Sequence, residues 1–497
     1  MRPLETLTLI ALLPSLLIWF VQRGRRPHWS PYLPGIPALV AMVQLLLEGY
    51  RWQMVPAYTL TAALLLIAGY SIVFGTQARR EPSSRRRVLS TAGTAFGLLM
   101  LLIAAAMPAL FPVFRFPEPT GRYAVGTGFF YWVDLARPET CTPDPDDHRE
   151  VSAQIWYPAD PDTGGVPTRY MPKEAGRALG ESFDIPAPMF DHFALVRTHS
   201  HLNAAAARAG TPFPVITYST SGLMSSHIGL FEELASHGYV VLCIGHPYWN
   251  PFVYGAAGEV LPFDGENECN EAWWAEEDGA KHAKEQITVA KTTEAQERAQ
   301  RQHNALKPVA IADLRRWGND IGFALDELAA LNRGNGPLAG TLDMERVGIM
   351  GFSKGGAAAG QFCVTDERCS AGINLTGFMY GDIVDIDLVR PFMFVSEEET
   401  WCADCYVNDL FYKRAENSAY QMKIRGARHA RFGDPALWGG VFQSLAGGAN
   451  IDGKRMTRIV NAYALAFFDK HLRGEAVPLL DGPSVDFPEV AFRSRHG

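Results

Sequence analysis

The sequence predicts an all-α transmembrane bundle followed by an α/β domain with a mostly parallel central sheet. Apolar stretches fill residues 1–115, and from about residue 151 short apolar runs alternate with helical patterns, as in sheets built from crossover units. The charge divides at the same place. Residues 1–115 hold 11 Arg and 3 Glu without Lys or Asp, which is a net charge of +8. Because the whole chain has a net charge of −8, the remaining residues must carry −16. We therefore expect two domains, 1–115 and 116–497. An acidic body does not suit a phosphate backbone, so no nucleic-acid partner is expected.

The N-terminal apolar stretches are candidate membrane anchors. They cover residues 4–21, 36–47, 55–74 and 89–113. About 20 apolar residues cross a bilayer as a helix, so the first, third and fourth stretches qualify as spans. The second has only 12 residues including Gln44, and it fits a re-entrant or interfacial segment as well as a span. The first stretch has neither a basic leader nor a small-residue cleavage site, which favours an anchor of about four helices over a cleaved signal peptide.

Arginines predict the orientation of this anchor. Two connections are rich in Arg, namely residues 23–26 and 79–87, whereas the alternate connections contain only Arg2 and Arg51. Loops rich in Lys and Arg stay in the cytoplasm, so the N-terminus, the 48–53 turn and everything after residue 113 are expected outside. The prediction is a multi-pass protein of the cytoplasmic (inner) membrane, with its acidic domain on the periplasmic side.

The cysteines agree with an extracytoplasmic body. All seven lie beyond the anchor, at positions 141, 243, 269, 363, 369, 402 and 405. Cys243 falls in the apolar run 239–244 and is expected to be a buried strand thiol, which leaves six that could pair in an oxidising compartment. Cys363 with Cys369, and Cys402 with Cys405, are plausible disulfides. A single CxxC without a second ligand pair does not indicate zinc, and nothing indicates a metal or an organic cofactor.

The body is expected to alternate strands and helices. Predicted strands cover residues 214–218, 239–244, 346–350, 370–375, 391–395 and 420–424. Predicted helices cover residues 228–236, 310–332, 354–362 and 456–472. Between the second strand and the second helix lies a polar insertion, residues 247–307, and an excursion of this length from a compact sheet is typical of a lid or substrate-facing cap. Trp273 and Trp274 within it are expected either to anchor the insertion or to form an acyl-binding or membrane-facing patch.

The strongest chemical motif is G-F-S-K-G-G over residues 351–356. It follows a predicted strand and precedes an Ala-rich helix, which is the strand-turn-helix context of a G-x-S-x-G nucleophile elbow. Small residues are needed because the turn is tight and holds Ser353 in a strained conformation. A serine hydroxyl needs a base, and His429, just after the last predicted strand, has the position that His471 and His496 lack.

These stretches resemble a known family, the plasma-type platelet-activating factor acetylhydrolases, and more closely their bacterial membrane-anchored, dienelactone-hydrolase-like relatives. The matching stretches are G-R-Y-A-V-G at 121–126, Q-I-W-Y-P at 154–158, E-L-A-S-H-G-Y at 233–239, the elbow, and I-R-G-A-R-H at 424–429. E-G-Y-R-W-Q-M-V-P at 48–56 extends the resemblance into the anchor. Each motif alone is moderately specific for the family. Their order along most of residues 120–470 is strongly specific for it.

The resemblance implies an α/β-hydrolase fold, with helices on both faces of the sheet, and ester hydrolysis through an acyl-serine. By motif position Ser353 is the nucleophile and His429 the general base. The oxyanion hole would consist of backbone N–H groups of Lys354 and Gly222. The loop carrying Gly222 departs from the usual Ser-His-Gly, since it reads Ser-Thr-Ser at 219–221, and this restricts the turn.

The acid of the expected triad is open. The family position holds Thr376, which cannot stabilise an imidazolium by charge. Many α/β-hydrolases place the acid one strand later, where Glu399 matches, and Asp382 and Asp404 are further candidates. Losing the acid typically costs several orders of magnitude in rate but leaves residual catalysis. His246, together with Tyr248 at the carboxyl edge of the sheet, is expected near the pocket.

Two functions therefore remain. The first is a membrane-anchored serine ester hydrolase acting on lipid-derived or small amphiphilic esters, with the bilayer and a lipid or small-molecule ester as partners. An acyltransferase using the same Ser353 is a variant of it. The alternative is a membrane-tethered binding or scaffold protein of the same fold, catalytically impaired at Thr376. The intact elbow and His429 favour the enzyme.

Overall fold

The computed structural model describes residues 1–18, 27–74, 84–160, 164–263, 267–398, 403–445 and 451–496. The chain divides into two compact units, one of residues 1–114 with Trp438–Ser444 and the other of residues 115–437 with 445–497. The short segment Trp438–Ser444 was not expected in the first unit. It joins that unit because the Phe442 ring packs edge-on against Phe111, with centroids 5.9 Å apart.

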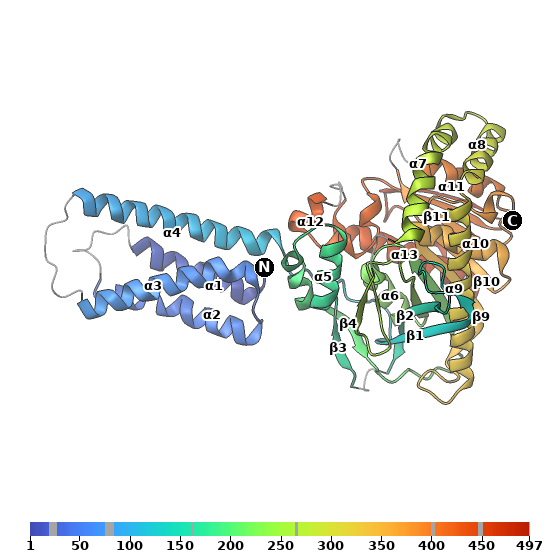
Figure 1. Cartoon of the computed structure of the whole chain (residues 1–497). Coiled ribbons are helices and arrows are strands. Elements are labelled where there is room, and N and C mark those ends of the chain that lie inside the picture. Colours follow the sequence, from blue (N-terminus) through green and yellow to red (C-terminus); the bar gives the residue numbers. More distant parts are fainter. Residues whose placement is uncertain are drawn as a thin grey trace. The chain divides into compact units, whose positions relative to one another are not determined.

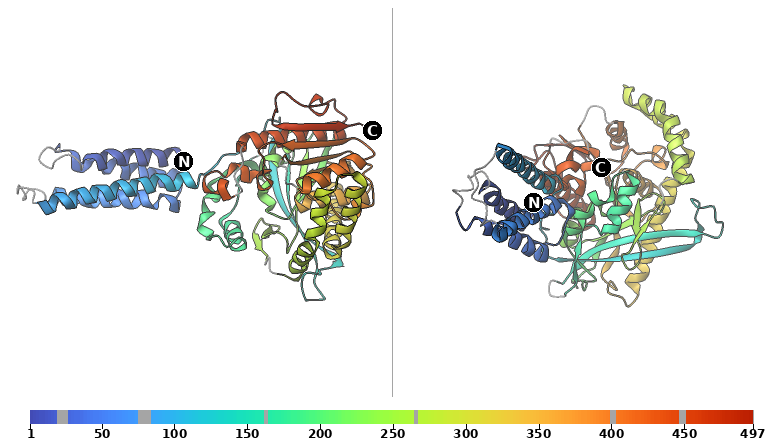
Figure 2. Two further views of the ribbon diagram at one scale, coloured as in Figure 1. Left: turned by 90° about the horizontal axis from the view of Figure 1, so that it is seen from above. Right: turned by 60° about the vertical axis from the view of Figure 1, so that its left-hand side comes forward.

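The first unit is a bundle of four helices, drawn in blue in Figures 1 and 2. They are α1 (Pro3–Leu17), α2 (Gly35–Leu47), α3 (Val55–Phe74) and α4 (Ser84–Leu110), with 3-10 turns at Ser30–Tyr32 and Trp52–Met54. Buried leucines and alanines of α1, α3 and α4 form its core. A buried ion pair, Arg51 to Glu5 at 3.2 Å, ties the turn before α3 to the first turn of α1.

Three apolar elements of the described residues are long enough to cross a membrane: Ser30–Leu47, Trp52–Phe74 and Thr91–Leu110. The second stretch, predicted from only 12 residues, lies in a longer element, because the 3-10 turn at Ser30–Tyr32 extends it to 18 residues. Conversely, α1 is a shorter apolar helix within the described residues, with 15 residues. Gln44, the polar residue that made the second stretch marginal, is buried and donates its side-chain N–H to the Gly49 carbonyl at 3.0 Å.

The second unit is built on one mixed sheet. In the described residues its strand order is β13-β12-β11-β10-β9-β5-β6-β2-β1-β4-β3. Its parallel centre consists of β5 (Phe213–Thr220), β6 (Val240–Gly245), β9 (Leu342–Phe352), β10 (Cys369–Leu375), β11 (Phe392–Glu397) and β12 (Ala419–Ile424). The flanking strands are β1 (Ala124–Pro138), β2 (His148–Ala159), β3 (Val166–Arg169), β4 (Arg197–Leu202) and β13 (Val490–Arg495). Every residue of β5 and β6 is buried, as expected of parallel strands covered on both faces.

Helices cover both faces of the parallel centre. They are α6 (Ile228–Ser236), α9 (Pro308–Arg333), α10 (Lys354–Thr365), α11 (Ala403–Arg414) and α13 (Gly453–Arg473), with the short α5 (Lys173–Ser182) and α12 (Gly440–Leu445) elsewhere. Consecutive residues of a strand point to opposite faces. On β9, Gly348 lies against Phe468 of α13, whereas Ile349 belongs to the cluster under α9 and α10. The sheet is therefore a buried layer between two layers of helices, which is the α/β-hydrolase architecture.

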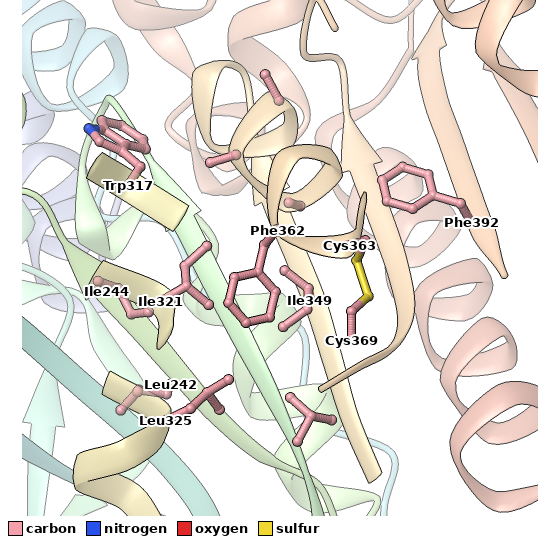
Figure 3. Close-up of a cluster of buried hydrophobic side chains, with 14 of the residues drawn as sticks. Leu242, Ile244, Trp317, Ile321, Leu325, Ile349, Phe362, Cys363, Cys369 and Phe392 are labelled. Atoms are coloured by element: carbon pink, nitrogen blue, oxygen red, sulfur yellow. A yellow bond between two sulfur atoms is a disulfide. The ribbon is translucent and has the colours of Figure 1, made fainter. Parts of the chain in front are cut away.

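The main core lies between the sheet and the α9–α10 face. Figure 3 shows Trp317, Ile321 and Leu325 of α9 beside Leu242 and Ile244 of β6, with Phe362 of α10 over Ile349. The helix predicted at residues 310–332 corresponds to α9, which supplies this buried face. Because the core fixes α10 against β9, it also fixes the turn between them.

The insertion follows β6 as expected. It contains a small hairpin, β7 (Phe252–Tyr254) with β8 (Val260–Pro262), and a helical hairpin of α7 (Glu268–Val289) and α8 (Thr293–Ala305), which Figure 1 shows. A disulfide between Cys141 and Cys269 ties the start of α7 to the turn between β1 and β2. Trp273 packs on Trp249 at 5.6 Å, while its neighbour Trp274 is 61% exposed. Trp273 also packs against the main core of the domain, so this indole anchors the insertion, whereas Trp274 lies on its surface.

Two of the cysteine predictions are confirmed. Cys363 and Cys369 form a disulfide between the end of α10 and the start of β10 (Figure 3), and Cys243 is a buried free thiol on β6. Cys402 lies outside the described residues, so its pairing with Cys405 stays a prediction.

Candidate active site

The nucleophile elbow lies between β9 and α10, as its motif predicts. Ser353 is the residue between strand and helix and has φ 56° and ψ −126°, a left-handed conformation that is costly for a residue with a Cβ. The turn is closely packed, because a Cβ at Gly351 would overlap the Gly355 carbonyl, and one at Gly355 would overlap that of Ser219. The glycines are therefore needed to bring the elbow against β5.

His429 lies within hydrogen-bond distance of this serine. It opens a 3-10 turn, His429–Arg431, shortly after β12, and its Nε2 is 3.1 Å from Ser353 Oγ. The Phe352 ring packs beside the imidazole at 4.8 Å between centroids. Burial lowers the pKa of His429, and the nearby Lys284 ammonium of α7 lowers it further. A neutral imidazole is the form that can accept the serine proton.

The other nitrogen of the imidazole is occupied by Thr376. Thr376 Oγ1 lies 2.8 Å from His429 Nδ1, so the residue at the family's acid position does contact the base. Thr376 follows β10 and has φ 55°, and its N–H donates to the Val395 carbonyl at 2.8 Å. A β-branched residue is unusual in this left-handed region, whereas Asp and Asn adopt it more readily.

The proposed acids differ in where the structure places them. Glu399 lies outside the described residues, and so does the side chain of Asp404, so neither can be placed. Asp382 does not contact His429. Its carboxylate accepts hydrogen bonds from Arg315 at 2.6 Å and from Gln361 at 2.7 Å instead. The arginine is the main reason that the pKa of Asp382 is lowered.

The two expected oxyanion donors lie on the two sides of the elbow. Lys354 is the first residue of α10, and the first N–H groups of a helix have no acceptor within that helix. Gly222 lies in the loop after β5, and its N–H donates to Thr220 Oγ1 at 3.1 Å. Ser221 is not among the described residues that have a positive φ. The backbone at this position therefore does not need the glycine that the family usually has there, and the serine causes no strain.

The sequence did not predict a buried cation beside the site. The Lys354 side chain forms an ion pair with Asp313 of α9 and lies among the rings of Trp249, Trp273 and Trp317. Burial lowers the pKa of Lys354 to about 7, although Asp313 opposes this shift. The lysine beside an elbow serine was visible in the motif, but its partners come from α9 and the insertion, far away in the sequence.

His246 was expected near the pocket, but it does not line the site. It is fully buried, with Nδ1 2.9 Å from Asp320 Oδ2 and Nε2 3.1 Å from Ser219 Oγ. Its neighbour Tyr248 packs against Phe263, with ring centroids 5.0 Å apart. Burial turns His246 into a structural link between β5, β6 and α9. No cluster of three His, Cys, Asp or Glu side chains that could hold a metal is found in the described parts of the chain.

Comparisons with known proteins identify the family of this chain. The family described as "Platelet-activating factor acetylhydrolase, isoform II" matches residues 109–477, which is more than half of the 497-residue chain. Platelet-activating factor acetylhydrolase from Canis lupus familiaris is 26% identical over 383 residues, covering 72% of this chain and 77% of that protein. The Bos taurus protein of the same name is 25% identical over 376 residues, with coverage of 72% and 77%. A probable 1-alkyl-2-acetylglycerophosphocholine esterase from Arthroderma benhamiae is 32% identical over a shorter stretch, 30% of this chain and 43% of that protein.

A solved structure shares the fold. Ferulic acid esterase from Streptomyces cinnamoneus superposes with a TM-score of 0.59 at 24% identity, covering 77% of this chain and 99% of that one. At this identity the likeness establishes the α/β-hydrolase fold alone. The family match, with its acetylhydrolase relatives, supplies the reaction class. The chain therefore belongs to the platelet-activating factor acetylhydrolase family and is a carboxylic ester hydrolase.

Proposed function

We propose that the protein is a membrane-anchored serine ester hydrolase that acts on lipid-derived or small amphiphilic esters through an acyl-serine intermediate. The observation that carries the proposal is the 3.1 Å approach of His429 Nε2 to Ser353 Oγ in a nucleophile elbow. A neutral imidazole that carries its proton on Nδ1 would donate it to Thr376 Oγ1, 2.8 Å away, and would leave Nε2 free to act as a base.

The proposed reaction has two halves. His429 Nε2 takes the proton of Ser353 as Oγ attacks the ester carbonyl carbon. The backbone N–H groups of Lys354 and Gly222 stabilise the negative charge on the carbonyl oxygen, with the Gly222 N–H shared between this oxygen and Thr220 Oγ1, to which it donates in the free enzyme. His429 then gives the proton to the leaving alcohol as the ester C–O bond breaks, which leaves an acyl-serine. Water repeats the sequence, with His429 as its base, and releases the acid.

The proposed anchor keeps this site close to lipid. Three apolar helices of the first unit could cross a membrane, and the Arg-rich connections at 23–26 and 79–87 favour a periplasmic position for the hydrolase unit. An anchored enzyme meets substrates that partition into the bilayer, as the membrane-anchored relatives of this family would. Alkaline phosphatase fusions after residues 30, 78 and 115 test the topology, with activity expected only for the last of the three.

The enzymatic proposal is tested with the full-length protein in detergent. Hydrolysis of short-chain p-nitrophenyl esters and of short-chain phospholipid esters is compared for wild type, Ser353→Ala, Thr376→Val, Glu399→Gln and Asp382→Asn. We expect turnover by wild type and none by Ser353→Ala. Because Asp382 binds Arg315 rather than His429, Asp382→Asn should retain activity. A wild type no more active than Ser353→Ala on both substrate classes would favour the tethered binding protein.

A further inference from the structure

A short turn after β6 lies against the loop that carries Gly222. It reads H-P-Y-W-N over residues 246–250, and the N–H groups of Trp249 and Asn250 both donate to the His246 carbonyl at 3.1 Å. Tyr248 within it has φ 70°, so the chain reverses sharply here. The reversal directs the side chains of residues 246, 249 and 250 toward β5 and α9.

Asn250 is 2% exposed, and its amide is fully engaged. Its Oδ1 accepts the N–H of His246 at 2.6 Å, while its Nδ2 donates to the Thr220 carbonyl at 2.9 Å and also to the Gly222 carbonyl. One side chain therefore bonds two carbonyls of the loop after β5. These bonds cross 28 and 30 positions of sequence.

The two bonded carbonyls determine how the loop presents its N–H groups. A peptide unit is planar, so fixing its carbonyl also fixes the N–H on its other side. The Thr220 carbonyl belongs to the unit before the Ser221–Gly222 peptide, and the Gly222 carbonyl to the unit after it. The peptide that contains the Gly222 N–H is thus held from both ends by Asn250.

The turn itself is rigidly supported. His246 bonds Asp320 at 2.9 Å and Ser219 Oγ at 3.1 Å, and Asp320 in turn binds the buried Arg149 guanidinium at 2.7 Å. All of these side chains are buried. Asn250 therefore bonds the loop from a fixed base, which a surface side chain could not provide.

The same turn also reaches the other oxyanion donor. The indole Nε1–H of Trp249 donates to Asp313 Oδ1 at 3.1 Å, and Asp313 forms the ion pair with the Lys354 side chain. Residues 249 and 250 therefore contact partners on both sides of Ser353. A shift of this one turn would change the separation of the two expected donors.

We propose that Asn250 is the positioning residue of the oxyanion hole, holding the Thr220–Gly222 loop so that its N–H groups face the ester carbonyl oxygen. The proposal rests on the proposed ester-hydrolase function. Asn250 does not touch the substrate. Asn250 lowers the free energy of the transition state more than that of the bound substrate. The negatively charged oxygen of the transition state binds strongly to donors at fixed positions, whereas the neutral carbonyl oxygen of the substrate binds them only weakly.

The test uses Asn250→Asp and Asn250→Ala in the full-length protein. Asp keeps the size of the side chain and the acceptor for His246, but it removes both donated bonds. We expect kcat to fall about 10²-fold in both variants, with KM changed by less than about 3-fold, since one oxyanion donor is worth about 10²–10³ in kcat. Rates are divided by the number of sites titrated to completion with a fluorophosphonate, so that misfolded molecules are not counted.

A second readout isolates the oxyanion. A trifluoromethyl ketone that adds to Ser353 should lose about as much affinity as kcat loses, while an unreactive ether analogue of the substrate should bind as in wild type. Asn332 of α9 offers a control, because its amide also bonds the backbone of another element, β9, donating to the Leu342 carbonyl at 2.9 Å and accepting the Leu342 N–H at 3.1 Å. Asn332→Ala should lower the melting temperature without lowering kcat per titrated site.

The outcomes separate the two proposals. An inactive wild type would reject the ester-hydrolase function together with this inference. An active wild type, with Asn250→Asp within about 3-fold of it in kcat per site, would reject only the positioning role, since the expected loss is about 10²-fold. Equal loss of affinity for the ketone and for the ether analogue would also reject it, since that pattern indicates a general distortion of the site.

Discussion

Thr376 Oγ1 lies 2.8 Å from Nδ1 of His429, which places a neutral hydroxyl against the proposed base of a carboxylic ester hydrolase. The hydroxyl can accept the Nδ1 proton, and in doing so it holds the ring with Nε2 toward Ser353 Oγ at 3.1 Å. It brings no charge, so the imidazolium formed during the reaction is not stabilised as it would be by a carboxylate. In most triads one aspartate both orients the imidazole ring and stabilises its positive charge. Thr376 can do only the first.

Thr376→Asp should therefore increase activity. We expect kcat to rise at least about 10-fold, a small part of the roughly 10⁴-fold that a triad carboxylate is worth, and Thr376→Val to lower it. The backbone favours the change as well, because residue 376 has φ 55°, where Asp is more common than a β-branched residue. Steady-state kinetics of the two variants on one ester decide the matter. A folded Thr376→Asp that is no faster than wild type, with Glu399→Gln inactive, would assign the acid to Glu399 instead.

The acid limb of the wild-type pH profile should lie below the ordinary range of a histidine. Burial and Lys284 lower the pKa of His429, so the neutral, reactive imidazole persists below its ordinary range. The acid limb of kcat/KM reports this group in the free enzyme, and its midpoint should lie below about 6.5. In Thr376→Asp a carboxylate favours the charged imidazole, and the midpoint should move up. A wild-type midpoint above about 7 would contradict the first expectation.

Strain at the elbow should be measurable in inactive variants. Ser353 has φ 56° and ψ −126°, a conformation that glycine adopts far more easily than a residue with a Cβ. Ser353→Ala keeps the Cβ and the strain, whereas Ser353→Gly removes both. We expect the Gly variant to be more stable than the Ala variant by about 1 kcal/mol. Thermal melts of the two, neither of which can react, provide the comparison, and equal melting temperatures would show that the elbow is unstrained.

The two disulfides within the described part of the chain should contribute unequally to stability. Cys141–Cys269 closes a separation of 128 residues, and Cys363–Cys369 one of 6. Chain entropy alone assigns them about 5 and about 2 kcal/mol. Replacing both cysteines of a pair by serine should lower the unfolding midpoint more for the first pair, which also tethers α7, and the second pair is its internal control. The reverse order would mean that packing around Cys363 and Cys369 outweighs chain entropy.

Much of the parallel sheet could be predicted from the sequence. The apolar run 239–244 corresponds to β6 at Val240–Gly245, and the helix predicted at 228–236 has the bounds of α6. Fully buried elements produce unbroken apolar runs, which are easy to recognise. The strands outside the parallel centre were not predicted. β1 contains Gly126 and Gly128 and is half-exposed along much of its length, so its pattern is weak. β13 alternates buried and exposed residues over only six positions, next to the C-terminus.

The site shows the same division. Ser353 and His429, which the structure brings to 3.1 Å, could be proposed from the sequence because each lies in a short motif directly after a strand, where local spacing carries the information. Asn250 was missed because its role depends on bonds to backbone carbonyls 28 and 30 residues away, which no residue pattern records. His246 was placed at the right sheet edge but with the wrong surroundings, since the sequence did not reveal that Asp320 and Ser219 bury it.

Ser353 and Thr376, at the ends of adjacent strands β9 and β10, both have left-handed backbones without being glycine. A library screened for heat resistance alone should therefore enrich Gly at position 353, where ψ is −126°, and Gly, Asn or Asp at position 376. An assay of esterase activity would then distinguish survivors changed at position 353 from those changed at position 376. Survivors changed at 353 would be inactive, while those with Asp at 376 would be both more heat-resistant and faster. These two neighbouring positions would thus show, in one experiment, where thermal robustness conflicts with catalysis and where the two can improve together.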